Sequence, residues 1–554
     1  MQSTSSKTTS SFRPLPFFTK CVEVFREKYN KGLPKWVLSF DGPLKAFGVN
    51  ETCTQLLSES MGLLWQRWAK KLLTEGLGTM CVPQIYFEAG KPVMKFVLFL
   101  SRPKEALRMG RSHVSKDIEL GQVESKHVVN VADVEVWKTQ RRHMVDAFLP
   151  SGPLSDFVPT LATMADQMVE NWHVELLHKK HTQEQDVLDV REWMHHTALG
   201  MFVACMMGDD RAFGPELEHP LALDVDLYAE YEDDIQFADT TPKNSLPARS
   251  LFNLEGLGLS LSAEEQQARF IKAMGYVGKL VNRGEERQEN GQVIGPLMER
   301  IIPLKQDEKI ANTLATLVAG HDTTAYTMQF VLMELARNPQ MQRRVRTECT
   351  TILNDIQAKG DVLTYSDLPR FELLTKCIAE TLRMWNVAGI VFPRVTSYDD
   401  QLIGMDNKTM VDIPKGTKFT FWYYGQHHSK ALWGEDVMDW NPDREWHPRE
   451  LMKSTDKNDS DWNTAQTPCT ERFHPFSIPT RDCLGKGFAM TEMRILLPRV
   501  ICNFNIDMPQ NSELVGVKPE VTNDVFANWT RKIGGPAQPH QLRLKITPLN
   551  QAKM

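Results

Sequence analysis

The chain has 554 residues, a formal net charge of −6, and ordinary globular proportions of hydrophobic (42%) and charged (24%) residues. This composition excludes a disordered or fibrous protein, and without a basic excess there is no reason to expect nucleic-acid binding. The nine cysteines are an odd number with no CxxC pair, which argues against a disulfide framework or a zinc ribbon and favours a reducing, intracellular compartment.

The N-terminal stretch carries little structural signal. Residues 1–22 contain three basic side chains, many Ser and Thr, and no acidic residue, as a transit peptide does, and a disordered polar tail is the alternative. The longest clean apolar run, at 198–208, is shorter than the roughly 20 residues that span a bilayer. We expect an N-terminal extension over residues 1–40 and one large domain over 41–554. Any membrane contact should be at most peripheral, and cytosol, organelle and the cytoplasmic face of a membrane all remain open as locations.

Helical periodicity dominates the middle and C-terminal parts of the chain. Short strands are expected at 95–100 and 418–424, and apolar spacing predicts a long helix through 314–335 that ends at residues 338–339, Asn-Pro. Residues 453–469 are polar enough to be a surface insertion. The sequence therefore predicts a mainly α fold with a minor β region.

Within the long helix lies the segment AGHDTT, Ala319–Thr324, in which a glycine and two threonines weaken ordinary helix propagation. The Thr323 hydroxyl can compete for the carbonyl of Ala319, four residues back, and open a small groove with room for dioxygen and water. Helix capping by Asp322 and a threonine is the alternative, but it fits poorly in mid-helix. We interpret the segment as functional.

Three further groupings are weak when taken singly. Trp137 and Arg141 lie one helical turn apart, which is most often a packed Trp beside a surface Arg. Glu380 and Arg383 share one helix face and would usually form a solvated salt bridge, and Arg444 in WNPDREW offers a further cation. Their significance depends on what accompanies them.

The most informative segment is 473–494, where a loop rich in Pro and Thr delivers Cys483 immediately before an amphipathic helix. The first N–H groups and the positive dipole end of that helix would face the sulfur and stabilise a thiolate. An inert buried thiol is the usual fate of a lone cysteine. Pro498 inside the helix predicts a kink or an early end.

This segment resembles the heme loop of the cytochrome P-450 superfamily, Phe-x-x-Gly-x-Arg-x-Cys-x-Gly. Phe476, Arg481, Cys483 and Gly485 match in register. Pro479 stands where the family usually has Gly, and because Pro fixes φ we expect this loop to turn differently. The resemblance implies that Cys483 is the iron ligand, since a thiolate pushes electron density onto heme iron and favours O–O cleavage.

The weaker groupings match the same superfamily in the correct order, so the resemblance covers about residues 130–510. It implies that Trp137 and Arg141 donate to a heme propionate, with Arg394 and Arg481 as further partners.

The resemblance also assigns the remaining motifs. In AGHDTT, it implies that Ala319 and Gly320 lie against the heme while Asp322 and Thr323 guide protons to the oxygen site. The Glu-x-x-Arg pair with its distant Arg is similar to a structural network that locks the chain beneath the heme.

The resemblance further implies the P-450 fold, one b-type heme (iron protoporphyrin IX), and NAD(P)H-derived electrons from a separate reductase or ferredoxin. We predict a heme-thiolate monooxygenase that inserts one oxygen atom from O2 into an apolar organic substrate. A heme-thiolate isomerase or dehydratase of a peroxide is an alternative, although Asp322 and Thr323 argue against it. A non-enzymatic heme sensor is another, and the sequence carries no code for the substrate.

Basic residues near the thiolate side are candidates for docking an acidic electron donor. A merely solvated surface explains them equally well. They are Lys138, Arg142, Arg472, Lys486 and Arg494.

Overall fold

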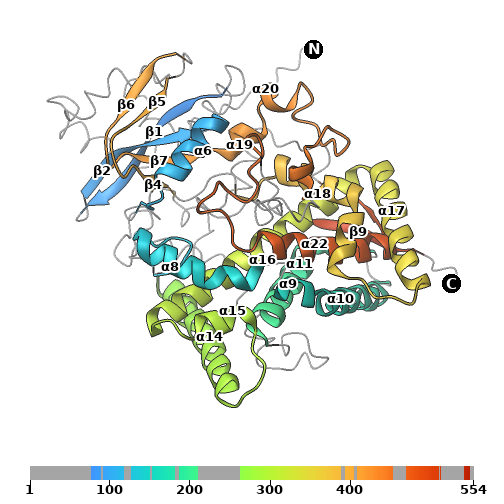
Figure 1. Ribbon diagram of the computed structural model, residues 1–554. Helices are drawn as coiled ribbons and strands as arrows, with labels where there is room; N and C mark the ends of the chain where they lie inside the picture. Colours follow the sequence, from blue (N-terminus) through green and yellow to red (C-terminus); the bar gives the residue numbers. More distant parts are fainter. Residues whose placement is uncertain are drawn as a thin grey trace, which may run out of the picture.

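Helices dominate the computed structural model, and its described strands fall into three small sheets (Figure 1). The mainly α fold with a minor β region is therefore confirmed. The predictions for residues 1–40 and for the insertion at 453–469 lie outside the described part of the chain, which comprises 77–88, 91–117, 126–149, 152–180, 186–209, 263–388, 393–404, 408–452, 470–510, 512 and 542–549.

The helical elements of the described residues range from single turns to the 32-residue helix α16. They are α6 (Pro103–Ser112), α8 (Val134–Val145), η1 (Asp146–Phe148), α9 (Pro153–Asp156), α10 (Val158–Lys179), α11 (Val190–Phe202), the π-helical turn η2 (Val203–Met207), α14 (Ala263–Glu289), α15 (Pro296–Ile301), α16 (Gln306–Arg337), α17 (Pro339–Ala358), η5 (Tyr365–Arg370), α18 (Glu372–Met384), α19 (Tyr423–His427), α20 (Lys430–Trp433), η6 (Pro448–Leu451) and α22 (Lys486–Asn503).

The strands are short apart from the first two. They are β1 (Thr79–Glu88), β2 (Lys91–Leu100), β3 (Val187–Asp189), β4 (Arg394–Val395), β5 (Asp400–Ile403), β6 (Met410–Ile413), β7 (Lys418–Phe421), β8 (Phe504–Asp507) and β9 (Arg543–Pro548).

The largest sheet has the order β1-β2-β7-β4 and joins the N-terminal part of the described chain to its C-terminal half. The strand predicted at 95–100 lies within β2. The strand predicted at 418–424 is right only for β7, because helix α19 begins two residues after that strand ends. A lone bridge between Lys116 and Arg394 continues the pairing beside β4. The other sheets have the orders β3-β9-β8 and β5-β6.

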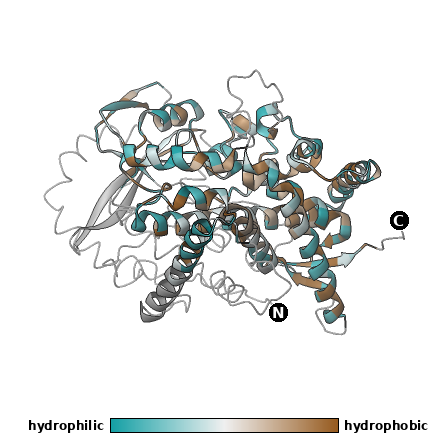
Figure 2. Ribbon diagram, turned by 60° about the horizontal axis from the view of Figure 1, so that its bottom comes forward, coloured by the Kyte–Doolittle hydropathy of each residue, from teal (hydrophilic) through white to brown (hydrophobic). Residues whose placement is uncertain are grey.

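Helix α16 is the central element of the helical part (Figure 1). It packs against α11, α14, α17, α18 and α22. Its end before Asn338 confirms the predicted boundary. Most helices carry both hydrophobic and hydrophilic residues, as expected where one side of a helix is buried and the other is exposed (Figure 2). Among the described residues, no helix combines the length and the hydrophobicity that crossing a membrane requires.

Helix α22 continues through Pro498 to Asn503, so the predicted early end is wrong. A proline inside a helix removes one backbone hydrogen bond. Here Leu497 and Val500 on either side of it are fully buried, and their packing against the core holds the helical course.

Candidate cofactor site

The loop before α22 places Cys483 just outside the helix start. The N–H of Cys483 donates to the carbonyl of Phe476 over 2.9 Å, and helix α22 begins at Lys486. The Cys483 side chain is solvent-accessible. Even so, burial by the surrounding protein raises the pKa of its thiol, and the Lys486 charge and the N–H of Gly485 only partly oppose this. We expected the start of helix α22 to stabilise the Cys483 thiolate and so lower its pKa. In the structure, desolvation has the larger effect and the pKa is raised. A metal bound at the sulfur would supply the missing stabilisation of the thiolate.

Tyr423 anchors the same loop and was not found from the sequence. The hydroxyls of Tyr423 and Ser477 are 2.9 Å apart, and the N–H of Ile478 donates to the Tyr423 oxygen over 3.0 Å. Ser477 takes the left-handed conformation, with φ of 69°, two residues before Pro479. Gly110 of α6 lies so close that a Cβ there would be 2.7 Å from the Ile478 side chain, so the loop is enclosed by packing as well as by hydrogen bonds.

The structure brings Trp137, Arg141 and Arg481 together. Trp137 is buried, and the guanidinium carbons of Arg481 and Arg141 lie 4.6 Å and 5.9 Å from the centre of its ring. Arg141 also donates to the carboxylate of Asp482 over 2.6 Å and to its carbonyl over 2.8 Å. Helix α8 is thereby tied to the residue that precedes Cys483.

A cluster of buried cations adjoins this group. Arg394 and Arg481 are 1% and 9% exposed, and each donates to a backbone carbonyl, Gly110 over 2.6 Å and Val131 over 2.7 Å. The Nε of Arg394 and the Nε and Nη1 of Arg481 are buried without an acceptor. Burial lowers the pKa of Arg394 to about 10. Burial and the charges of Arg394 and Arg141 lower the pKa of Arg481 to about 9.

Lys116 belongs to the same cluster, and nothing in its local sequence indicated it. Burial and the charges of Arg394 and Arg481 hold its pKa well below the ordinary value. The cluster gathers several buried cations, and few carboxylates of the chain lie close enough to compensate them. Such a cluster favours binding of an anionic group. These residues therefore fit a cofactor that carries carboxylates.

Helix α16 contains the hydrogen bond that was predicted within the segment Ala319–Thr324. The Thr323 hydroxyl donates to the carbonyl of Ala319 over 3.2 Å, and Ala319 is exposed although the helix around it is largely buried. The helix itself is uninterrupted.

Asp322 has different surroundings from its neighbour Thr323. Its carboxylate is buried, 3.4 Å from Nδ1 of His195 in α11 and 3.7 Å from Nε2 of His321. Among the described residues, these three groups are close enough together to share a metal ion or a proton, since their donor atoms lie within 4.8 Å of one another. His195 was not indicated by the sequence.

Gly320 makes room for an aromatic ring. A Cβ at Gly320 would lie 2.3 Å from a ring carbon of Phe202 in α11. The Phe202 ring in turn meets Phe488 of α22 edge to face, with ring centres 5.9 Å apart. Phe202 therefore joins α16 to the helix that follows Cys483.

The Glu-x-x-Arg grouping forms the expected network. Arg383 holds both carboxylate oxygens of Glu380 over 2.8 Å, and Nε of Arg444 lies 3.0 Å from each of the same oxygens. Arg383 also donates to the carbonyl of His427 over 2.7 Å. Glu380 and Arg383 are completely buried, so this is a core network and not a surface pair.

The expected docking face is wrong for Arg494, which is buried and donates to the hydroxyl of Thr375 and the carbonyl of Leu451. Arg472 is committed to Glu450. Of the five basic residues, Lys486 pairs with Asp482, and Lys138 and Arg142 are exposed.

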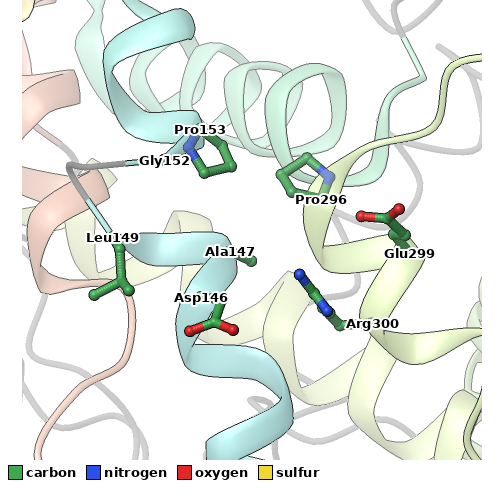
Figure 3. Close-up of a pocket in the computed structure, with 8 residues that line it drawn as sticks. All are labelled: Asp146, Ala147, Leu149, Gly152, Pro153, Pro296, Glu299 and Arg300. Carbon is green, nitrogen blue, oxygen red and sulfur yellow. The ribbon is translucent and has the colours of Figure 1, made fainter.

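A separate surface pocket lies between η1–α9 and α15 (Figure 3). Its volume is about 310 Å³, and no residue predicted from the sequence lines it. It is bounded by Asp146, Ala147, Leu149, Gly152, Pro153, Pro296, Glu299 and Arg300.

Comparison with known proteins independently supports the resemblance to the cytochrome P-450 superfamily. The sequence profile of the family described as Cytochrome P450 matches residues 90–250 and 285–523. The chain is 31% identical to Cytochrome P450 52A3-A of Candida maltosa over 223 residues, 39% of each chain. It is 23% identical to Cytochrome P450 3A6 of Oryctolagus cuniculus over 405 residues, 70% of this chain and 72% of the relative. It is 30% identical to a Cytokinin hydroxylase of Arabidopsis thaliana over 192 residues, 35% of this chain and 32% of the relative. Two of these three alignments therefore span well under two thirds of the relative.

Proposed function

Because the chain belongs to the cytochrome P450 family, whose cofactor is heme b, we propose that it is a heme-thiolate monooxygenase. It inserts one oxygen atom from O2 into an apolar organic substrate and takes its electrons from a separate NAD(P)H-dependent reductase or a ferredoxin. When bound, the heme supplies the electron transfer and the activation of oxygen. Cys483 is the iron ligand in this proposal, and Phe476 and Gly485 shape the loop that presents it.

The observation that carries the proposal is the cation cluster beside Cys483. Arg394 and Arg481 hold buried nitrogen atoms without an acceptor, and Trp137 packs against both Arg481 and Arg141. Carboxylates of the cofactor would accept hydrogen bonds from these nitrogens and compensate their charge. The same contacts would fix the orientation of the cofactor relative to the thiol.

Proton delivery falls to helix α16. The Thr323 hydroxyl is held by the Ala319 carbonyl and can turn its proton toward the oxygen site. Asp322, buried against His195, stores the next proton at its carboxylate. In this proposal Ala319, which is exposed, lies against the heme, while Gly320 beside it packs against the Phe202 ring of α11.

The iron ligand is tested by replacing Cys483→His. The variant should retain some heme but lose the long-wavelength Soret band of the reduced carbon monoxide complex, because only a thiolate donor gives that band. Cys377→Ser, a change of a buried thiol on α18, should keep the band. A normal band in Cys483→His would show that the ligand is another residue.

The reaction class is tested by the consumption of NADPH and oxygen with a reductase, using a substrate found by ligand-induced spin-state shifts. An isomerase or dehydratase would convert a peroxide without NADPH, and a heme sensor would catalyse neither reaction. Thr323→Ala should form less product per NADPH and release more hydrogen peroxide with an unchanged heme spectrum. Asp322→Asn should slow turnover roughly 10²-fold. Unchanged product yield in the first and unchanged rate in the second would refute these roles.

A further inference from the structure

Two thiols meet where α17 packs against α22. Cys349 of α17 is fully buried and Cys502, near the end of α22, is half-buried. The hydroxyl oxygen of Thr350, the residue that follows Cys349 on α17, lies 3.4 Å from the Cys502 sulfur, and each of the two thiols shifts the pKa of the other. Both thiols therefore lie at the contact between α17 and α22, and Cys502 is the less buried of the two.

A positive charge is held beside Cys502 by backbone geometry. The guanidinium of Arg346 donates from Nε to the carbonyl of Ile501 and from Nη2 to that of Phe504, each over 2.8 Å, and these carbonyls flank Cys502. Arg499, one helical turn earlier, is fixed to Asp166 over 2.7 Å. The cations cannot move away without losing these bonds.

These surroundings shift the pKa values of the two thiols in opposite directions. The hydrogen bond from Cys349, then that from Thr350 and the charges of Arg346 and Arg499, lower the pKa of Cys502 to about 7. The hydrogen bond to Cys502 and burial raise the pKa of Cys349 well above its ordinary value. Cys502 is therefore both the more acidic and the less buried of the two thiols, and it is the nucleophile.

We propose that Cys349 and Cys502 form an oxidation site at which hydrogen peroxide converts the two thiols into a disulfide between α17 and α22. The Cys502 thiolate attacks one peroxide oxygen, so an S–O bond forms, the O–O bond breaks, and the hydroxide that leaves takes a proton to become water. The Cys349 sulfur then attacks the oxidised Cys502 sulfur, the S–O bond breaks, and the second hydroxide leaves as water with the Cys349 proton. Two thiols and one peroxide give one disulfide and two waters.

The proposal does not depend on the reaction that the heme carries out. It concerns the end of α22 remote from Cys483, and its reagent can be added directly. The disulfide would fasten α22, the helix that follows the iron-ligand loop, to α17.

The experiment treats heme-loaded protein with limiting hydrogen peroxide, blocks remaining thiols in denaturant, and maps cysteines by peptide mass spectrometry. The expected product is a disulfide between Cys349 and Cys502, while Cys377 and Cys205, whose thiol pKa values burial raises, remain alkylated. Formation should accelerate as the pH rises through about 7, because the Cys502 thiolate becomes more abundant. The carbon monoxide difference spectrum, recorded before and after, checks that the heme is retained.

Single variants separate the two roles. In Cys349→Ser, Cys502 should stop at the sulfenic acid, which a dimedone-type probe traps. In Cys502→Ser, Cys349 should stay reduced. The proposal is overturned if the parent forms no such disulfide, if Cys502 reacts no more than roughly tenfold faster than Cys377, or if Cys349 is oxidised equally well in Cys502→Ser.

Discussion

Two groups of buried arginines in this molecule differ in how completely the chain itself supplies their hydrogen-bond acceptors. In the first, every nitrogen of Arg383 and Arg444 donates to an oxygen of the chain, and both guanidinium groups bind the carboxylate of Glu380. In the second, Arg394 and Arg481 donate to backbone carbonyls and keep three buried nitrogens without an acceptor. Burial is similar in both groups.

The two groups carry similar charge. They differ in whether the chain supplies hydrogen-bond acceptors and a carboxylate for the arginine nitrogens, and this difference distinguishes a structural network from a candidate binding site. A buried cation whose counter-charge lies within the chain is complete when the chain folds. A buried cation without one destabilises the fold by several kcal/mol until an anion arrives. The second group is therefore our candidate for binding an anionic molecule, and the carboxylates of heme b would meet that requirement.

Breaking the first group should have the largest effect. Glu380→Ala leaves two buried guanidinium groups without their carboxylate, which should cost about 3–5 kcal/mol of folding free energy and yield little heme-loaded protein. Chemical denaturation and the heme content per chain measure this. Glu435→Ala, which removes the exposed partner of Lys430, is the control and should change stability by less than about 0.5 kcal/mol. Normal heme loading in Glu380→Ala would contradict the structural role.

Breaking the second group should have a smaller effect and fall on the cofactor. Arg481→Met removes charged donors worth about 1.5–3 kcal/mol, so heme should be lost roughly 10- to 100-fold faster to excess apomyoglobin. The apoprotein should keep or gain stability, because a buried cation without a carboxylate is removed. Arg481→Lys should lie between the parent and the Met variant in heme retention. Equal heme loss from all three proteins would show that Arg481 does not contact the cofactor.

Acid should lower the folding stability through two buried histidines near the first group, His428 and His474. Burial lowers the pKa of His474 to about 4 and, together with the charge of Arg383, that of His428 to about 3. Both values lie below the unfolded value of about 6.5. The stability that the neutral rings contribute is therefore fully present above about pH 6.5 and is lost as the pH falls toward 4, by up to about 1.4 kcal/mol per pH unit for each ring.

Urea unfolding at a series of pH values checks this dependence. His474→Gln cannot take up the proton, so its stability should fall less steeply with acid than that of the parent. His178→Gln, at an exposed position on α10, should follow the parent. A His474→Gln curve parallel to the parent would mean that His474 already titrates normally in the folded protein.

Exposed cations should have the smallest effect. Lys138→Ala combined with Arg142→Ala should leave folding unchanged and make reductase-supported turnover less sensitive to ionic strength than in the parent, because exposed charges act mainly on encounter rates. Lys430→Ala is the matched control, since Lys430 is exposed and paired within the chain. If the double variant and the parent respond identically to salt, α8 takes no part in docking.

The sequence predicted what is local or lies in a fixed motif register. The resemblance to a family motif singled out Cys483, Arg481 and Phe476 within one loop, and Glu380 and Arg383 within one helical turn. Their roles toward the heme stay predictions. The end of α16 followed from the Asn-Pro stop, but its start did not, because the helix begins at Gln306, before the apolar spacing that starts at Leu314. Helical spacing and helix stops depend on local backbone geometry, whereas the loop motif was found by its resemblance to a family.

The parts that sequence reasoning missed depend on contacts between distant segments. Lys116 reaches the site through its bridge to Arg394, and Asp322 is buried against His195 of another helix. Arg494 looked like a surface cation but is buried against Thr375. The raised pKa of Cys483 likewise follows from partial desolvation by segments distant in sequence, which a helix-terminus argument on the local sequence does not contain.

The contact of Phe202 with Gly320 links the evolution of two distant positions. The Phe202 ring occupies the volume where a side chain at 320 would lie and touches Phe488 of α22, so the ring sets the spacing of three helices. A larger residue at 320 is accommodated only if residue 202 becomes smaller, and a smaller residue at 202 leaves a void unless 320 fills it. Among natural variants of this chain the two positions should therefore covary, although neither belongs to a recognisable motif together with the other.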